Sequence, residues 1–417
     1  MSEPPAAPLT TADGVPLKVS LRRTVRRSKI KALLLVAPLL AFLFIAFLMP
    51  LFEMLWRSVD NPEVSTHLSR TVSALEGWNG ESLPDEATFA ALAEDLREGQ
   101  QERNLGLLSS RLNYEKSGMR STISRTARRV GTLEPPYRES LIEVNNTWGE
   151  LDTWKLIQRE ASPYTISYYL AAVDLQLSPD GEIVQVPEHM QIHATLFWRT
   201  LWMSAVITGL TLLLGFPVAF LLASLPARHS NLLMILVLLP FWTSLLVRTT
   251  TWIAILQSQG VLNDVMVALG VIADEARWQM IHNKMGTIIA MTHILLPFMI
   301  LPLYSVMKTI PPSYMRAARS LGGKPFLSFR RVYFPLTIPG IAAGGILVFI
   351  LSIGYYITPA LVGGQSGRFI TNYIAYHMQT SLNWGLAAAI ASILLFVVII
   401  CYLVFNRLIG VDKVKLG

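Results

Sequence analysis

A short loop in the C-terminal third of the chain carries its most specific pattern of residues. From position 311 to 323 the sequence is Pro-Pro-Ser-Tyr-Met-Arg-Ala-Ala-Arg-Ser-Leu-Gly-Gly. The two prolines end a preceding helix, and we expect Ser313 to cap a new one. Gly322 suits the left-handed position that stops a helix. The loop therefore predicts a short helix over 313–321.

One face of this helix is apolar, which points to noncovalent docking. Four residues recur at i, i+3, i+4 and i+7, the spacing of one helix side: Tyr314, Ala317, Ala318 and Leu321. So short a helix gains too little from its own hydrogen bonds to be stable alone. Because nothing in the loop can cover this face, we expect another protein to cover it. The alternative is an ordinary basic loop that ends in a turn glycine.

Motifs for covalent chemistry are absent from the sequence. There is no phosphate-binding Gly-x-x-x-x-Gly-Lys-Ser/Thr, no His-Glu-x-x-His, no Cys-x-x-Cys and no nucleophile elbow. Gly322-Gly323-Lys324-Pro325 lacks the upstream glycine and the Ser/Thr of a phosphate loop. We therefore expect no catalysis, no metal and no cofactor bound by this chain.

The composition is typical of a membrane protein, with 52% hydrophobic residues and a mean hydropathy of +0.44. Crossing about 30 Å of hydrocarbon takes about 20 mostly apolar residues. The first apolar run is too long for a signal peptide and lacks a small-residue cleavage site, so it is expected to stay as an anchor. Six spans are predicted, at 31–56, 196–224, 231–256, 284–307, 333–357 and 384–406.

Basic residues set the expected orientation, because they gather on the cytoplasmic side. They precede the first span, follow the second at Arg228, fill the loop 308–332 and recur in the tail at Arg407, Lys413 and Lys415. Both termini are therefore expected in the cytoplasm. The net charge of +7 reflects this distribution and not nucleic-acid binding.

A long polar stretch, 57–195, is then expected outside the cytoplasm. Its apolar spacing predicts one or two amphipathic helices over 85–130 and another over 137–157. The segment 164–170 is rich in β-formers, and a turn signal at 178–181 precedes a further strand. Cys401 is the sole cysteine, so no disulfide can brace this insert. It is either a docking surface for a soluble protein or a structural spacer.

The segment 239–252 could line a transport pathway, since broken helices with proline often do so. Arg248 is costly in lipid, and so it faces the pathway, a neighbouring subunit or the outer interface beside Trp252. Tyr355 is either an interfacial aromatic or a substrate contact. The candidate pathway residues are Trp242, Arg248, Thr251 and Tyr355.

The loop resembles the EAA loop of permease subunits of type I ATP-binding-cassette importers. Three matches carry the resemblance: Ala317-Ala318, Leu321-Gly322, and the downstream Phe334-Pro335-Leu336 with Pro339-Gly340. Arg316 departs from it, because the family usually has Glu there. With Ser313 as cap, that Glu would complete a capping box, and its loss costs about 0.5–1 kcal/mol of local helix stability.

A narrower resemblance is to the spermidine/putrescine branch of these permeases. It rests on Pro240-Phe241-Trp242-Thr243 with Leu246-Val247-Arg248, on Gly260-Val261-Leu262-Asn263 and on Ile357-Thr358-Pro359-Ala360-Leu361-Val362-Gly363-Gly364. It covers approximately 30–56 and 195–410 and leaves out the insert.

The resemblance implies a multi-pass permease of the bacterial inner membrane that moves a small charged solute, foremost a polyamine. Its implied partners are ATP-binding subunits that hydrolyse ATP with Mg, a second permease (a distinct homologue first, or else a copy of this chain), a soluble substrate-binding protein and membrane lipid, but no nucleic acid. The residues that would couple to the ATPase are Tyr314, Arg316, Ala317, Ala318, Leu321 and Gly322. The alternative is an ion- or proton-coupled secondary transporter that uses His293.

The predicted fold is an all-α membrane protein of six transmembrane helices, with a large mixed, mostly helical extracytoplasmic insert between the first two. Its predicted parts are a basic cytoplasmic tail (1–30), the first span (31–56), the insert (57–195), a permease core of five spans (196–407) with the coupling loop 308–332, and a cytoplasmic tail (408–417).

Overall fold

The computed structural model describes residues 17–409 and forms two compact units, divided between Arg57 and Ser58. The first unit is one long helical segment, made of α1 (Leu17–Leu43), a π-helical turn (Phe44–Leu48) and α2 (Met49–Arg57). From Thr24 to Arg57 it is long and apolar enough to cross a membrane. The predicted first span is confirmed as an apolar helix, which begins before residue 31.

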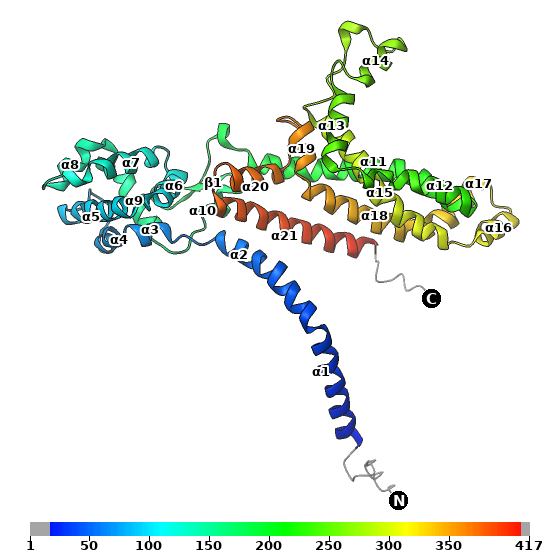
Figure 1. The fold of residues 1–417 in the computed structure, drawn as a ribbon, viewed down its shortest axis with the longest axis horizontal. Coiled ribbons are helices and arrows are strands. Elements are labelled where there is room, and N and C mark those ends of the chain that lie inside the picture. Colours follow the sequence, from blue (N-terminus) through cyan, green and yellow to red (C-terminus); the bar gives the residue numbers. More distant parts are fainter. Residues whose placement is uncertain (1–16, 410–417) are drawn as a thin grey trace, which may run out of the picture. The chain divides into compact units, whose positions relative to one another are not determined.

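The second unit is built on four long apolar helices (Figure 1): α11 (His193–Ser224), α15 (Lys284–Thr309), α18 (Phe334–Gly354) and α21 (Trp384–Ile409). α11, α15 and α18 pack against one another around buried Met203, Met291 and Met299. Gly344 lets α18 approach α15, because a Cβ there would lie 2.8 Å from the Met299 sulfur. Such close approach at a small residue is typical of packed membrane helices.

The third predicted span, 231–256, is present as a bent pair of helices. The chain forms α12 (Ala227–Leu238), a 3₁₀ turn (Leu239–Trp242), α13 (Leu245–Leu256) and α14 (Val261–Ala268), and it bends by 96° between the two halves. Pro240 cannot continue a helix, and the Ser244 hydroxyl restarts one by accepting a bond from the Val247 N–H at 3.1 Å. The described residues therefore hold five straight candidate spans, or six if the bent pair counts as one.

Residues 58–192 fold mainly into helices around their own apolar core, which includes Phe89, Trp148 and Trp154. The helices are α3 (Glu63–His67), α4 (Ser69–Leu75), α5 (Glu86–Glu102), α6 (Leu105–Glu115), α7 (Met119–Arg129), α8 (Tyr137–Val144), α9 (Leu151–Glu160) and α10 (Ser167–Ala171). An antiparallel hairpin is formed by β1 (Leu175–Leu177) and β2 (Ile183–Gln185), which lie on either side of the predicted turn at 178–181.

Three local predictions for this insert need correction. The stretch 85–130 forms three helices, and 137–157 contributes two, α8 and α9, separated by a 3₁₀ turn. The β-rich segment 164–170 contains helix α10, whose start is favoured by a bond from the Ser167 N–H to the Thr165 hydroxyl at 3.0 Å. Burial of the Tyr168 ring against α21 outweighs the β preference of its residues.

Short helices join the long ones in the rest of the unit. They are α16 (Pro312–Ser320), α17 (Pro325–Ser328), a π-helical turn (Phe329–Tyr333), α19 (Ile357–Val362) and α20 (Ile370–Gln379). Within this unit, the insert lies near α20, whereas α16 and α17 lie at the opposite end of the long helices (Figure 1).

The insert is attached to the helices of the core by specific contacts. The Asp174 carboxylate caps α11 by accepting the backbone N–H groups of Ile192, His193 and Ala194 at 3.1, 3.0 and 2.8 Å. The Tyr168 ring lies so close to Gly385 of α21 that a Cβ there would be 2.4 Å from it. These contacts fix the insert to the ends of α11 and α21.

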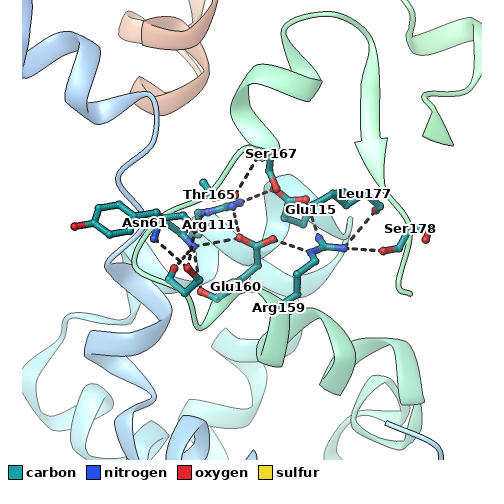
Figure 2. Close-up of polar contacts among 11 residues, drawn as sticks. Asn61, Arg111, Glu115, Arg159, Glu160, Thr165, Ser167, Leu177 and Ser178 are labelled. Carbon is teal, nitrogen blue, oxygen red and sulfur yellow. Dashed lines mark hydrogen bonds and ion pairs between the residues drawn. The ribbon is translucent and has the colours of Figure 1, made fainter. Parts of the chain in front are cut away.

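A buried ion cluster stands at the base of the insert (Figure 2). The Arg111 guanidinium donates to Glu160 at 2.5 Å, to Glu115 at 2.7 Å and to Asn61 at 2.6 Å. Arg111 and Glu160 are 2% and 1% exposed. The guanidinium also lies 4.8 Å from the centre of the Tyr168 ring, whose hydroxyl has a pKa raised by burial. The cluster therefore links the core of the insert to α10.

Replacing Arg111 by Met should strongly destabilise the insert. The Glu160 carboxylate would remain buried without its cation, which typically costs about 3–5 kcal/mol. We expect a lower melting temperature for R111M in detergent. Most of that loss should be recovered in R111M/E160M, because two apolar side chains can replace a buried pair at little cost. A single variant as stable as the double variant would contradict this account.

His377 should make folding sensitive to acid. Its Nδ1 lies 2.9 Å from the Ser381 hydroxyl, and its ring centre is 6.1 Å from that of His193. Burial, and then the charge of His193, lowers the pKa of His377 to about 4. Between that value and about 6.5, the ordinary value, the unfolded chain binds more protons, so the free energy of unfolding falls as the pH falls.

Melting temperatures at pH 7 and pH 5 test this. We expect H377N to lose less stability than the unmodified protein over this interval. The matched change at an exposed histidine, H189N, should leave the pH dependence as it is. Equal pH dependence in all three proteins would show that His377 does not contribute.

Candidate coupling loop and transport segment

α16 begins earlier than the sequence predicts. Its N-cap is Pro311 and its first residue is Pro312, and no side chain caps it. The prediction that Ser313 caps this helix is wrong, because proline is already set for the first helical position. Arg316 therefore lies in the second turn, where a Glu could not complete a capping box, so the expected cost of this departure does not arise.

α16 ends as predicted, at a glycine in the left-handed conformation. Gly322 has φ of +87° and its N–H donates to the Arg319 carbonyl at 2.9 Å. The Gly323 N–H reaches the Ala318 carbonyl at 3.1 Å. A Cβ on Gly323 would lie 2.7 Å from that same carbonyl oxygen, so both glycines are needed for this tight reversal.

The predicted apolar face is largely uncovered within the described residues. Tyr314 and Ala317 are exposed, Leu321 is 90% exposed, and Ala318 is partly covered. Met315 turns the other way and packs against the core of the long helices. Phe326, 75% exposed, adds to the open apolar surface. Phe326 is not among the residues predicted for this surface, although an aromatic residue just after Lys324-Pro325 in a basic loop is a usable signal.

Aromatic rings hold the base of this loop to α11. Phe329 lies in the π-helical turn before α18, and its ring centre is 6.2 Å from Phe216 and 6.0 Å from Phe220, both on α11. Tyr333 contacts the Phe220 ring edge-on at 5.3 Å. A displacement of the loop would therefore be transmitted to α11 as well as to α18.

The transport segment brings together Arg248 and two other predicted residues. The Arg248 guanidinium is close enough to Tyr355 and to His293 for its charge to act on both. Within residues 17–409 its Nε is buried and has no hydrogen-bond partner. His293 accepts a hydrogen bond from the Trp252 indole at 3.2 Å, so this histidine joins α15 to α13.

The other two pathway candidates stand apart from this group. Trp242 is 74% exposed at the bend between α12 and α13. Thr251 is exposed, and its hydroxyl donates to the Val247 carbonyl of the same helix at 2.8 Å. Their roles in transport stay predictions.

Five long apolar helices and a bent helix pair among the described residues are typical of a polytopic membrane protein. Among the described residues no group of three or more His, Cys, Asp or Glu could hold a metal ion. The chain belongs to the family of binding-protein-dependent transport system inner membrane components, whose model matches residues 198–411.

Within this family, the chain is similar to permeases of polyamine transport systems. The spermidine/putrescine transport system permease protein PotB of Haemophilus influenzae is 35% identical over 228 residues, covering 54% of this chain and 79% of the relative. PotB of Escherichia coli is 36% identical over 209 residues, covering 50% and 75%. A solved bacterial ABC transporter involved in alginate import matches with a TM-score of 0.43 and 19% identity, covering 53% of this chain and 80% of the solved one.

The predicted class is thereby confirmed. The chain is an inner-membrane permease subunit of an ABC importer, similar to polyamine permeases, and its family is not a family of enzymes. The family match begins at residue 198 and therefore leaves out the insert.

The glycine pair offers a structural test of the loop. In Gly323→Ala the new methyl group would clash with the Ala318 carbonyl, so the end of α16 should open. We expect trypsin to cleave after Arg319 several-fold faster in G323A. The control is G209A, a glycine with open space on α11, and it should be cleaved like the unmodified protein. Equal cleavage of all three would argue against a tight reversal.

Proposed function

We propose that this chain forms one half of the translocation pathway of an ATP-driven importer and that α16 couples it to an ATP-hydrolysing subunit. The observation that carries this proposal is the open apolar face of α16 with Tyr314, Ala317 and Leu321. A short helix with an uncovered apolar face needs a partner surface. Arg316 would contribute charge at the edge of that surface.

The coupling mechanism follows from how the loop is held. Closure of the ATPase subunits, which bind ATP and Mg, would displace α16. The displacement would reach α18 through the chain and α11 through the Phe216, Phe220 and Phe329 rings. The solute pathway would then change from facing outward to facing inward, because each state of the ATPase binds one arrangement of the spans better than the other.

The proposed orientation has α16 and both termini in the cytoplasm and the insert outside it. The basic loop around α16 and the insert lie at opposite ends of the long helices (Figure 1), and cytoplasmic loops are the ones that carry excess Lys and Arg. The predicted division into parts, including an extracytoplasmic insert over 57–195, belongs to this proposal. Of the predicted tails, residues 1–16 and 410–417 lie outside the described residues.

The proposed solute is small and charged, with a polyamine as the first candidate. Support comes from two PotB relatives named for spermidine and putrescine. A second permease subunit would face Trp242, Arg248, Thr251 and Tyr355, and it could supply a carboxylate to the unpaired Arg248 Nε. A soluble binding protein would deliver the solute. The secondary-transporter alternative is set aside, because the chain belongs to a family of binding-protein-dependent transport systems and because His293 is engaged with Trp252.

Charge placed on the docking face should uncouple the permease. Ala317→Glu would bring a carboxylate into an apolar interface, where an unpaired charge is costly. We expect the ATPase subunit to be lost from mild-detergent purifications of A317E, with ATPase activity in the eluate falling at least tenfold. Ala227 at the start of α12 is also an exposed alanine, and A227E should retain the subunit.

The unmodified protein provides the reference for this test. Its eluate should contain an ATP-binding subunit and a second permease, with measurable ATPase activity. A chain that purifies alone, or an A317E variant that still transports, would refute the coupling role.

A further inference from the structure

A cavity of about 560 Å³ lies where two of the long helices begin. Residues of α19 and α20 form most of its wall. Ile192, the residue before α11, and Thr380, which follows α20, also line it. The volume is within the range of small-molecule binding sites, and the transport segment described above contributes no residue to it.

Arg368 is the single charged residue among those that line this cavity. Its side chain is exposed and forms no ion pair or hydrogen bond within residues 17–409. The acidic residues between positions 193 and 409 are Asp264, Asp274 and Glu275, and the first two pair with Arg277. The described part of the helical core therefore leaves the cavity with an uncompensated positive charge.

Three tyrosines give the cavity an aromatic wall: Tyr356, Tyr373 and Tyr376. Their hydroxyls form no hydrogen bond within the described part of the chain, so they are available to donate to an anion. The faces of their rings can also attract an ammonium group. The cavity therefore combines groups that suit a negative charge with groups that suit an amine.

Backbone contacts hold this wall in place without using the arginine or the tyrosine hydroxyls. The Asn372 amide donates to the Tyr356 carbonyl at 2.6 Å and accepts the Phe369 N–H at 2.8 Å. The Ile370 N–H donates to the Thr200 hydroxyl at 2.9 Å. Both amides at the start of α20 are thereby bonded, so the positive charge of the cavity comes from the guanidinium and not from the helix start.

The cavity lies at the level where spans leave the hydrocarbon layer. α11 begins one residue after Ile192, and α21 begins four residues after Thr380. Both helices are long and apolar enough to cross a membrane. Trp198 and Trp384, near the starts of these helices, are 70% and 41% exposed, and exposed tryptophans are typical of the boundary between hydrocarbon and headgroups.

We propose that this cavity binds the headgroup of a zwitterionic glycerophospholipid of the phosphoethanolamine type. Arg368 would pair with the phosphate, to which a guanidinium is well suited, and the tyrosine rings would contact the ammonium group. The glycerol ester region would meet the apolar part of the wall, which consists of Ile192, Ala360 and Ala375.

Charge selects this occupant over two others. A polyamine has no anionic group and would be repelled by the unpaired guanidinium of Arg368. A purely anionic lipid would be disfavoured by the neighbouring insert, because residues 58–192 contain 21 acidic and 12 basic residues. A zwitterionic headgroup has no net charge. The inference requires a membrane-spanning chain and goes beyond the proposed coupling through α16.

Short-chain lipid tests the proposal on the purified full transporter, washed free of lipid in mild detergent. The probe is dihexanoyl-phosphatidylethanolamine. Its apparent Kd is taken from the rise in melting temperature with concentration, because a ligand that binds the folded state stabilises it. We expect Arg368→Gln to weaken this binding at least tenfold. R368K keeps the charge but loses the planar two-point contact, and should weaken it several-fold.

The matched control variant is K284Q. Lys284 is an exposed cation at the start of α15 and does not line the cavity, so K284Q removes the same charge and should bind the lipid like the unmodified protein. Dihexanoylglycerol has the same acyl chains without the phosphate, and its effect should be equal in R368Q and in the unmodified protein.

The source of the phosphate is tested with glycerophosphoethanolamine, which is the headgroup without acyl chains. We expect it to bind at least tenfold more weakly than the lipid. Equal binding of the two compounds, lost in R368Q, would overturn the lipid assignment in favour of a soluble phosphate ester.

Three further results would overturn the inference. An equal Kd in R368Q and the unmodified protein would show that Arg368 does not contact the phosphate. An equal loss in K284Q and R368Q would show a nonspecific charge effect. A lower melting temperature of R368Q without lipid, together with loss of the second permease, would show that Arg368 pairs with a neighbouring subunit. The unmodified protein would keep its ATPase subunit in each case, so this failure is distinguishable from failure of the proposed function.

Discussion

The hydrocarbon layer offers no water to satisfy backbone N–H and C=O groups, and this constraint governs the architecture of the core. It explains why the long segments are helices and why a break at Pro240 is followed at once by the Ser244 cap. It also explains why Arg248 is found where other helices can shield it, beside His293 and Tyr355. The polar strands and irregular loops are left to the insert and to the ends of the helices.

Features set by local chemistry were predictable from the sequence. Gly322 ends α16 in the left-handed conformation because glycine alone enters it at no steric cost, and the long apolar helices follow from length and hydropathy. Features set by competition between neighbours were not. α16 begins at Pro312 and not after Ser313. The segment 164–170, rich in β-formers, contains the start of helix α10 because the Tyr168 ring is buried there. The solvent exposure of the Phe326 side chain was also not predictable, because it depends on how the neighbouring elements fold.

Two kinds of exposed surface stand out on the described residues. α16 presents apolar atoms without a cover, whereas α7 presents arginines without acids. The first kind gains free energy by excluding water and tolerates salt; the second is attractive over a longer range and weakens with salt.

The contact between Tyr168 and Gly385 makes the insert part of the packing of the helical core. The Tyr168 ring occupies the space that a side chain on α21 would otherwise fill, and Leu196, Ile353 and Ile370 pack in the same cluster. The core of the protein is therefore completed by a residue that precedes α11. Excising the insert at the ends of the spans would therefore leave a hole beside Gly385.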